Sequence, residues 1–198
     1  MLSRYGFLVD TYETEILKVL SVWSSFHDDD LSARPNPTDS RGRSVREHMV
    51  HQSMSEDGWF KNMFGIEAGL PPLPDFETRV GFIRRYAEAA SARFAALRTR
   101  DDGWWEQEVA FFNTPRSRAW IMVRRIAHTA HHRGQQMALL RMLNREVYSN
   151  YGPTADTGGL AVNQASVVYA YPDLESLLAG GPKATLPGPG TKPAGERP

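Results

Sequence analysis

The sequence predicts an all-α protein, an antiparallel four-helix bundle followed by an irregular C-terminal extension. Two observations support this fold class. Four long segments repeat apolar residues at steps of three and four, which is the spacing of one buried helix face. Proline- and glycine-rich stretches separate these segments, and nothing between them predicts a convincing sheet. Long amphipathic helices bury their apolar stripes against one another, so a bundle is the expected architecture.

The first helix is predicted over residues 5–26, where the apolar stripe is continuous. It is followed by three aspartates, Asp28, Asp29 and Asp30, which we expect to form a solvated helix end. The helix cannot continue through Arg34-Pro35-Asn36-Pro37, because proline lacks the amide hydrogen and restricts the residue before it.

The second and third helices have recognisable start signals. Ser44 and Glu47 form a predicted capping box, and the helix that they begin should run to about Phe64 before Gly65. Asp75 is the expected N-cap of the third helix, which should end at the sequence Asp101-Asp102-Gly103. The apolar face of this third helix is expected to comprise Phe76, Val80, Ile83, Ala87, Ala90, Phe94 and Leu97.

The fourth helix is predicted from Pro115 to about Asn144, with Thr114 as its N-cap. Proline is favoured at the first helical position, where its missing amide hydrogen costs nothing. Residues 104–112, which precede this start, are aromatic and lack helical spacing, so they could be extended.

The composition after the fourth helix predicts two further parts of the chain. We expect the bundle to cover residues 1–148 and an irregular extension, residues 149–180, to pack on it. Within the extension, residues 167–171 could be a short strand or an apolar strap, and residues 172–178 a short helix. Residues 181–198 hold five prolines and four glycines and no aromatic residue, so this tail is expected to be disordered.

The overall composition excludes several classes of protein. The 198 residues include no cysteine, which rules out disulfides, thiolate zinc sites, iron–sulfur clusters and a cysteine nucleophile. The 23 basic and 23 acidic residues cancel, so the chain lacks the net positive charge on which most nucleic-acid-binding proteins rely. No signal peptide and no apolar run of about 20 residues is present, so we expect a cytoplasmic protein without a membrane segment.

Five of the six histidines fall in two clusters on predicted helices. Without cysteine, a transition-metal site must use histidine and carboxylate ligands. On the fourth helix His128 and His132 are four residues apart and share a face, whereas His131 lies on a stripe that also holds Arg124 and Arg141. His128 and His132 are therefore the preferred pair, although two such histidines alone are more often surface or hydrogen-bonded core residues.

The second helix offers two histidines, between which spacing does not decide. His48 and His51 are three residues apart and lie on roughly the same side of the helix. The apolar residues of this helix lie closer to His48, so periodicity alone slightly favours His48 as the third ligand.

Two segments resemble the DinB family of DNA-damage-inducible-like metal-binding proteins. The run from Arg125 to Gln135 contains the family's His-x-x-x-His-Arg-Gly-Gln pattern, which marks the last bundle helix. The run from Ser44, followed by Glu56 and Trp59, looks like the segment that carries the family's first histidine, normally the seventh residue after the capping residue. The resemblance covers about residues 5–145.

The resemblance implies a four-helix bundle with one long crossover and a divalent metal on three histidines. Zinc and nickel are the expected metals, because both accept imidazole ligands. The implied ligands are His51, His128 and His132. We give the resemblance more weight than the periodicity, so His51 is preferred to His48. His48 and His131 are the less favoured ligands. Glu56 could accept a hydrogen bond from a ligand imidazole, and Gln135 could orient a ligand or a water molecule. Arg133 could bind a substrate carboxylate through two hydrogen bonds, but we favour a salt bridge within the bundle.

Three neutral imidazoles leave a coordination position open, which is typical of a catalytic site. The wider superfamily that this fold resembles includes enzymes that use low-molecular-weight thiols, so a metal-dependent thiol S-transferase acting on a small molecule is the first hypothesis. A metal-dependent hydrolase and a non-catalytic metal-binding or stress-response bundle are the alternatives. The small residues Ala127, Gly134 and Ala138 could let a second copy pack as a homodimer, although internal packing explains them equally well.

Other enzyme classes lack their motifs in this chain. No glutamate is followed by histidine three residues later, as a di-iron bundle requires. The chain contains no His-Glu-x-x-His, Gly-x-Ser-x-Gly or Walker sequence. Metal chemistry on histidine is therefore the hypothesis that the sequence favours.

Overall fold

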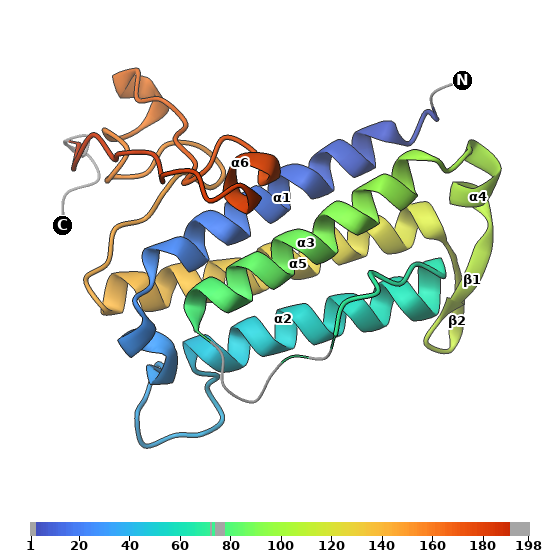
Figure 1. Cartoon of the computed structure of the whole chain (residues 1–198), viewed down its shortest axis with the longest axis horizontal. Coiled ribbons are helices and arrows are strands. Elements are labelled where there is room, and N and C mark those ends of the chain that lie inside the picture. Colours follow the sequence, from blue (N-terminus) through green and yellow to red (C-terminus); the bar gives the residue numbers. More distant parts are fainter. Residues whose placement is uncertain (1–2, 72, 74–77, 191–198) are drawn as a thin grey trace.

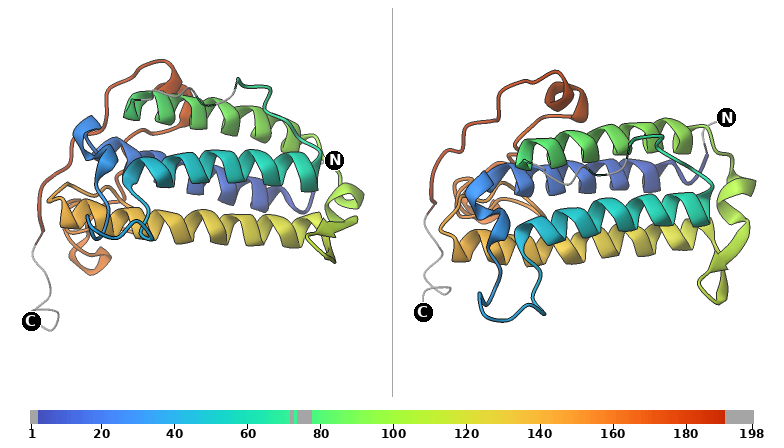
Figure 2. Two further views of the ribbon diagram at one scale, coloured as in Figure 1. Left: turned by 90° about the horizontal axis from the view of Figure 1, so that it is seen from below. Right: turned by 60° about the horizontal axis from the view of Figure 1, so that its bottom comes forward.

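The structure, a computed structural model, describes residues 3–71, 73 and 78–190 and confirms the predicted all-α class (Figure 1). The four main helices lie side by side along the long axis of the molecule (Figures 1 and 2). They are α1 (Gly6–Ser25), α2 (Val45–Trp59), α3 (Arg79–Arg98) and α5 (Arg118–Met142). The smaller elements are the 3₁₀ turns η1 (Asp28–Ser32) and η3 (Ala161–Asn163), the π-helical turn η2 (Phe60–Phe64), the short helices α4 (Asp102–Glu106) and α6 (Leu174–Leu178), and the strands β1 (Glu108–Phe111) and β2 (Thr114–Ser117).

The capping box predicted at the start of α2 is present. The Ser44 hydroxyl accepts the Glu47 amide hydrogen at 3.2 Å, and the Glu47 carboxylate accepts the Ser44 amide hydrogen at 2.6 Å. At its other end α2 continues into η2, and the chain leaves the helix at Gly65, whose φ of 65° suits glycine. This long α2 brings both of its histidines and Trp59 alongside α5.

The predicted start of the fourth helix at Pro115 is wrong. Thr114–Ser117 instead forms β2, which pairs antiparallel with β1 and places Pro115 opposite Ala110. Proline is tolerated in this two-stranded hairpin because each strand is an edge strand. The helix begins at Arg118, and Ser117 caps it by accepting the Trp120 amide hydrogen at 3.2 Å. Part of the aromatic stretch 104–112 is extended as β1, while its first residues belong to α4.

The third helix also begins later than predicted. Asp75, the expected N-cap, and Phe76 lie outside the described residues, and Thr78 caps α3 by accepting the Gly81 amide hydrogen at 3.1 Å. Val80 is exposed, because in the first turn it faces away from the bundle. The other five members of the expected apolar face are buried, namely Ile83, Ala87, Ala90, Phe94 and Leu97.

The sequence suggested that all three aspartates after α1 are solvated, but the structure shows that one of them is not. Asp30 is buried, and its carboxylate accepts two hydrogen bonds from the Arg145 guanidinium at 2.9 Å. It also accepts the His27 amide hydrogen at 2.7 Å, and these donors hold the pKa of Asp30 below its usual value against the opposing effect of burial. Asp30 therefore ties the end of α1 to the chain that follows α5.

The chain after α5 returns over α1 and α3 (Figure 1). The Ala170 amide donates to the Ser21 hydroxyl at 2.9 Å, and α6 inserts Leu174 and Leu177 into the core. Residues 167–171 form no strand in the described chain, so they act as a strap, whereas the short helix expected at 172–178 is present as α6. The predicted domain boundaries stay predictions, and residues 191–198 of the expected tail lie outside the described part of the chain.

A membrane-crossing segment is absent from the part of the chain that the structure describes. None of its helices combines the length and the apolar character that spanning a bilayer requires.

Candidate metal centre

Three histidines converge between α2 and α5. The Nε2 atom of His132 lies 3.0 Å from the Nε2 of His51 and 3.3 Å from the Nε2 of His128. All three potential ligand nitrogens lie within 4.8 Å of one another. Two zinc-bound imidazole nitrogens in a tetrahedral site are about 3.3 Å apart, given a Zn–N distance of about 2.0–2.1 Å. The spacing of these nitrogens therefore suits a metal ion, and the three residues are those that the resemblance to the DinB family implied.

Gln135 controls which nitrogen of His132 can bind a metal. Its side-chain oxygen lies 2.8 Å from His132 Nδ1, and because an amide oxygen only accepts, Nδ1 must carry the hydrogen. The neutral His132 ring then has its free electron pair on Nε2, which faces the other two histidines. The expectation that Gln135 orients a group at this site agrees with this contact.

The surroundings of the cluster keep its imidazoles neutral. Burial lowers the pKa of His128 to about 3, with a further contribution from the positive charge of Arg125. Burial also lowers the pKa of His132 to about 4 and brings that of His51 below its usual value. Neutral imidazole is the form that binds metal, so these shifts favour metal binding at neutral pH.

The two less favoured histidines lie beside the cluster without joining it. His48 is buried with its ring centre 5.7 Å from that of His132, and its Nδ1 has no hydrogen-bond partner in the described structure. His131 is exposed, and its ring centre lies 5.0 Å from that of His132. Neither belongs to the group of converging nitrogens, so the preference for His48 from periodicity does not match the geometry.

Glu56 does not accept a hydrogen bond from a histidine in the way the sequence suggested. It is fully buried, and its carboxylate accepts hydrogen bonds from the hydroxyls of Tyr12 and Tyr86, the latter at 2.7 Å. Arg93 donates to it at 2.9 Å, and Arg125 lies 3.5 Å away as an ion pair. We call these five residues the Glu56 network. They come from all four main helices and hold one negative and two positive charges in the core.

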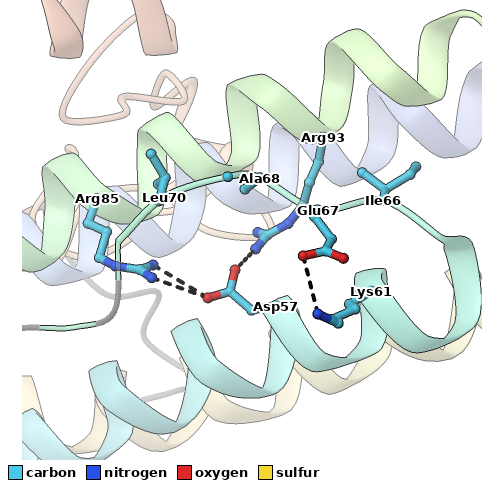
Figure 3. Close-up of a pocket in the computed structure, with 9 residues that line it drawn as sticks. Asp57, Lys61, Ile66, Glu67, Ala68, Leu70, Arg85 and Arg93 are labelled. Carbon is cyan, nitrogen blue, oxygen red and sulfur yellow. Dashed lines mark hydrogen bonds and ion pairs between the residues drawn. The ribbon is translucent and has the colours of Figure 1, made fainter.

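The Glu56 network continues to a pocket between α2 and α3 (Figure 3). Asp57 lies between two arginines there, in contact with Arg93 and 3.4 Å from Arg85. The pocket has a volume of about 160 Å³, and none of the converging histidines lines it. Its charged groups are paired with one another, as the Lys61–Glu67 pair at 3.2 Å also shows.

Trp59 forms one wall of the histidine cluster. Its ring centre lies 5.8 Å from that of His128. The Arg125 guanidinium lies 5.3 Å from the same Trp59 ring, and its Nη1 donates to Ser55 at 3.1 Å. Arg125 thus connects the Glu56 network to the wall of the cluster, a role that no local sequence signal indicated.

Arg133, the residue after His132, turns away from the histidine cluster. It is fully buried and pairs with Glu15 of α1, which confirms the salt bridge expected from the sequence. This pair helps to hold α5 against α1, because a buried arginine needs an anionic partner.

Comparison with known proteins identifies the family. The family model described as "DinB family" matches residues 12–158. The chain belongs to the DinB family. Its fold is similar to that of a DinB-like protein from Bacillus cereus ATCC 10987, with a TM-score of 0.66 at 18% identity over 76% of this chain and 100% of the other. A DinB-like protein (YjoA) from Bacillus subtilis is also similar, with a TM-score of 0.57 at 15% identity over 74% of this chain and 99% of the other. No curated protein matches this DinB chain.

Acid is expected to destabilise this DinB protein in its metal-free form. In the folded state the pKa is about 4 for His48 and His132 and about 3 for His128, against an ordinary value of 6.5. Between these pH values the unfolded chain binds protons that the folded chain does not bind. The contribution of these histidines to the free energy of unfolding is therefore fully present above about pH 6.5 and is lost as the pH decreases. Each such histidine contributes a slope of up to about 1.4 kcal/mol per pH unit.

Urea denaturation of the metal-free protein at about pH 7, 6 and 5 measures this effect. The variant His48→Gln keeps a side chain of similar size without the titrating group, so its slope should be smaller. An unfolding free energy that is the same at all three pH values would contradict the prediction.

Proposed function

We propose that the histidine cluster binds a divalent metal, zinc or nickel, and that the protein is a metal-dependent thiol S-transferase. The observation that carries the proposal is the convergence of the His51, His128 and His132 nitrogens at metal-ligand spacing. The DinB membership supports it, because the matched region includes all three residues. The substrates would be a low-molecular-weight thiol and a second small molecule.

The residues present fit such a metal. Three nitrogen ligands leave a position open for a substrate, which distinguishes catalytic from structural sites. A divalent metal held there would supply Lewis acidity, which lowers the pKa of a thiol or water that binds to it. Because the chain has no cysteine, the thiol must come from outside the protein.

The protein groups around the cluster have separate tasks in this proposal. Gln135 holds His132 in the tautomer that presents Nε2 to the metal. Trp59 shields the side of His128 from water, and the buried Arg125 adds a positive charge that favours an anionic thiolate nearby. None of these groups is in a position to act as the nucleophile itself.

Two alternative functions use the same residues. A metal-dependent hydrolase would activate water in place of a thiol. A non-catalytic metal-binding protein of the stress response would bind the metal without turnover and could act as a homodimer. Ala127, Gly134 and Ala138 are all exposed on α5, so this stripe is available to a second copy and is not explained by internal packing. We propose small molecules rather than nucleic acids as partners, and a cytoplasmic location.

The test is a conjugation assay on protein loaded with zinc or with nickel. Several small thiols are offered together with an electrophile, and the consumption of free thiol is followed. We expect thiol-dependent turnover in the wild type and in His131→Ala, whose side chain is exposed beside the cluster, and none in His51→Ala. Hydrolysis of esters or amides without thiol transfer would favour the hydrolase, and metal binding without either reaction would favour the non-catalytic alternative. Failure to bind metal would refute the proposal as a whole.

A further inference from the structure

An aromatic cluster of four side chains lies beside the histidines, where the hairpin meets the end of α2. Its members are Trp59, Phe111, Phe112 and Trp120. The Trp59 ring centre is 5.3 Å from Phe111 and 6.4 Å from Phe112, and Phe111 is 5.2 Å from Trp120. Phe112 is 69% exposed and Trp120 is 43% exposed. Large apolar side chains gathered at the surface in this way mark a binding surface more often than isolated ones do.

Phe112 occupies a backbone position that a bulky residue avoids. The pairing of Phe111 with Thr114 leaves a two-residue turn, and Phe112 is its first residue with a φ of 51°. Hairpin turns with positive φ at this position favour glycine or asparagine, and a bulky side chain there is strained. Packing does not compensate for the strain, because most of the Phe112 side chain is exposed. Strain of this kind is concentrated at functional sites.

The aromatic cluster is continuous with the candidate metal centre. Trp59 belongs to both, because its ring lies 5.8 Å from that of the ligand His128 and also contacts the two phenylalanines. From their exposed fractions, Phe112 and Trp120 together offer about 250 Å² of surface, and Trp59 and Phe111 are only partly exposed. A stable protein interface needs about 800 Å² on each partner. The cluster is therefore of a size that suits part of a small molecule better than a second copy of the chain.

We infer that the aromatic cluster binds an apolar, ring-bearing part of the small-molecule substrate, while a polar group of the same molecule reaches the three histidines. This inference rests on the proposed metal centre and specifies the class of its second substrate. Phe112 and Trp59 contact the ring and determine specificity. The turn leaves most of the Phe112 side chain exposed, where a ligand can reach it.

Two hydroxamates provide a matched pair of probes, because both bind divalent metals and differ in the group that they carry. Benzohydroxamate carries a phenyl ring, and acetohydroxamate carries only a methyl group. On zinc-loaded wild-type protein we expect benzohydroxamate to bind about tenfold more tightly than acetohydroxamate. In Phe112→Gly the preference should fall to less than about threefold, with the acetohydroxamate affinity unchanged.

The variant Phe112→Gly also separates binding from folding. Glycine adopts a positive φ without strain, so the melting temperature of the variant should equal or exceed that of the wild type. Its preference for the phenyl ring should nevertheless be lost. Phe7→Ala, which removes another exposed phenylalanine at the start of α1, is the matched control and should keep the full preference.

The outcomes distinguish this inference from the proposed function. If acetohydroxamate binds but the phenyl preference is absent, or survives in Phe112→Gly, the aromatic subsite is refuted and the metal centre stands. If zinc binds but neither hydroxamate does, the metal has no accessible open position, and the proposed catalytic function fails together with the subsite. If zinc itself does not bind, the metal centre fails. If the wild type dimerises and Phe112→Gly does not, a second copy covers the cluster and the inference is overturned.

Discussion

Replacing His51 by alanine is expected to weaken zinc or nickel binding by more than about 100-fold. Its Nε2 lies 3.0 Å from that of His132, so its removal leaves the two histidines of α5 alone. Substituting residues that only orient a ligand already lowers metal affinity by about 10–100-fold, so the loss of a ligand itself must exceed this range. Competition with a chromophoric chelator at neutral pH measures the affinity.

His48→Ala is the matched control, since His48 lies on the same helix, three residues earlier. It is buried near His132 but does not contribute a nitrogen to the converging group. Its metal affinity should stay within about tenfold of the wild type, because at most the orientation of a neighbouring ligand is disturbed. If His48→Ala lost the metal and His51→Ala retained it, the assignment of the α2 ligand would be wrong.

Replacing Glu56 by alanine is expected to lower the free energy of unfolding by about 3–5 kcal/mol. The carboxylate accepts hydrogen bonds from Tyr12, Tyr86 and Arg93, and all four residues are almost completely buried. Without it the Arg93 charge loses a buried partner, which costs much more than the loss of a surface ion pair. Urea denaturation of the metal-free protein at neutral pH measures the change.

Two further variants identify the cause of the loss. Glu56→Gln keeps the size of the side chain and removes the charge, so it should also be strongly destabilised. Glu67→Ala removes the carboxylate of an exposed ion pair with Lys61 and should cost less than about 1 kcal/mol. If Glu56→Ala cost no more than Glu67→Ala, the buried network would not stabilise the bundle.

Much of the fold was predictable because a long apolar stripe is a local property of the sequence. The capping box at Ser44 and the short helix after Asp173 also depend on neighbouring residues, and both are present. The hairpin was not predicted, because Thr114 and Pro115 form a good helix start when considered alone. Their pairing with residues 108–111 and the cap at Ser117 decide against that start, and helix signals do not reveal strand pairing.

The candidate site was also predictable only in part. The i, i+4 spacing of His128 and His132 follows from helix geometry, whereas the choice between His48 and His51 depends on how α2 faces α5. A helical wheel does not contain that information, and the resemblance to the DinB family supplied it. The contacts of Glu56 could not be foreseen, because its partners come from three other helices and are brought together only by folding.

The strap that crosses α1 has a consequence for the order in which the protein assembles during synthesis. Ser21 accepts the amide hydrogen of Ala170, and the Ser24 carbonyl accepts a hydrogen bond from Lys183 at 3.0 Å, so both partners lie about 150 residues further along the chain. A ribosome adds about 5–20 residues per second, so these contacts of α1 can form only roughly 8–30 s after α1 itself has been made. During that interval α1 exposes surface that the later chain will cover.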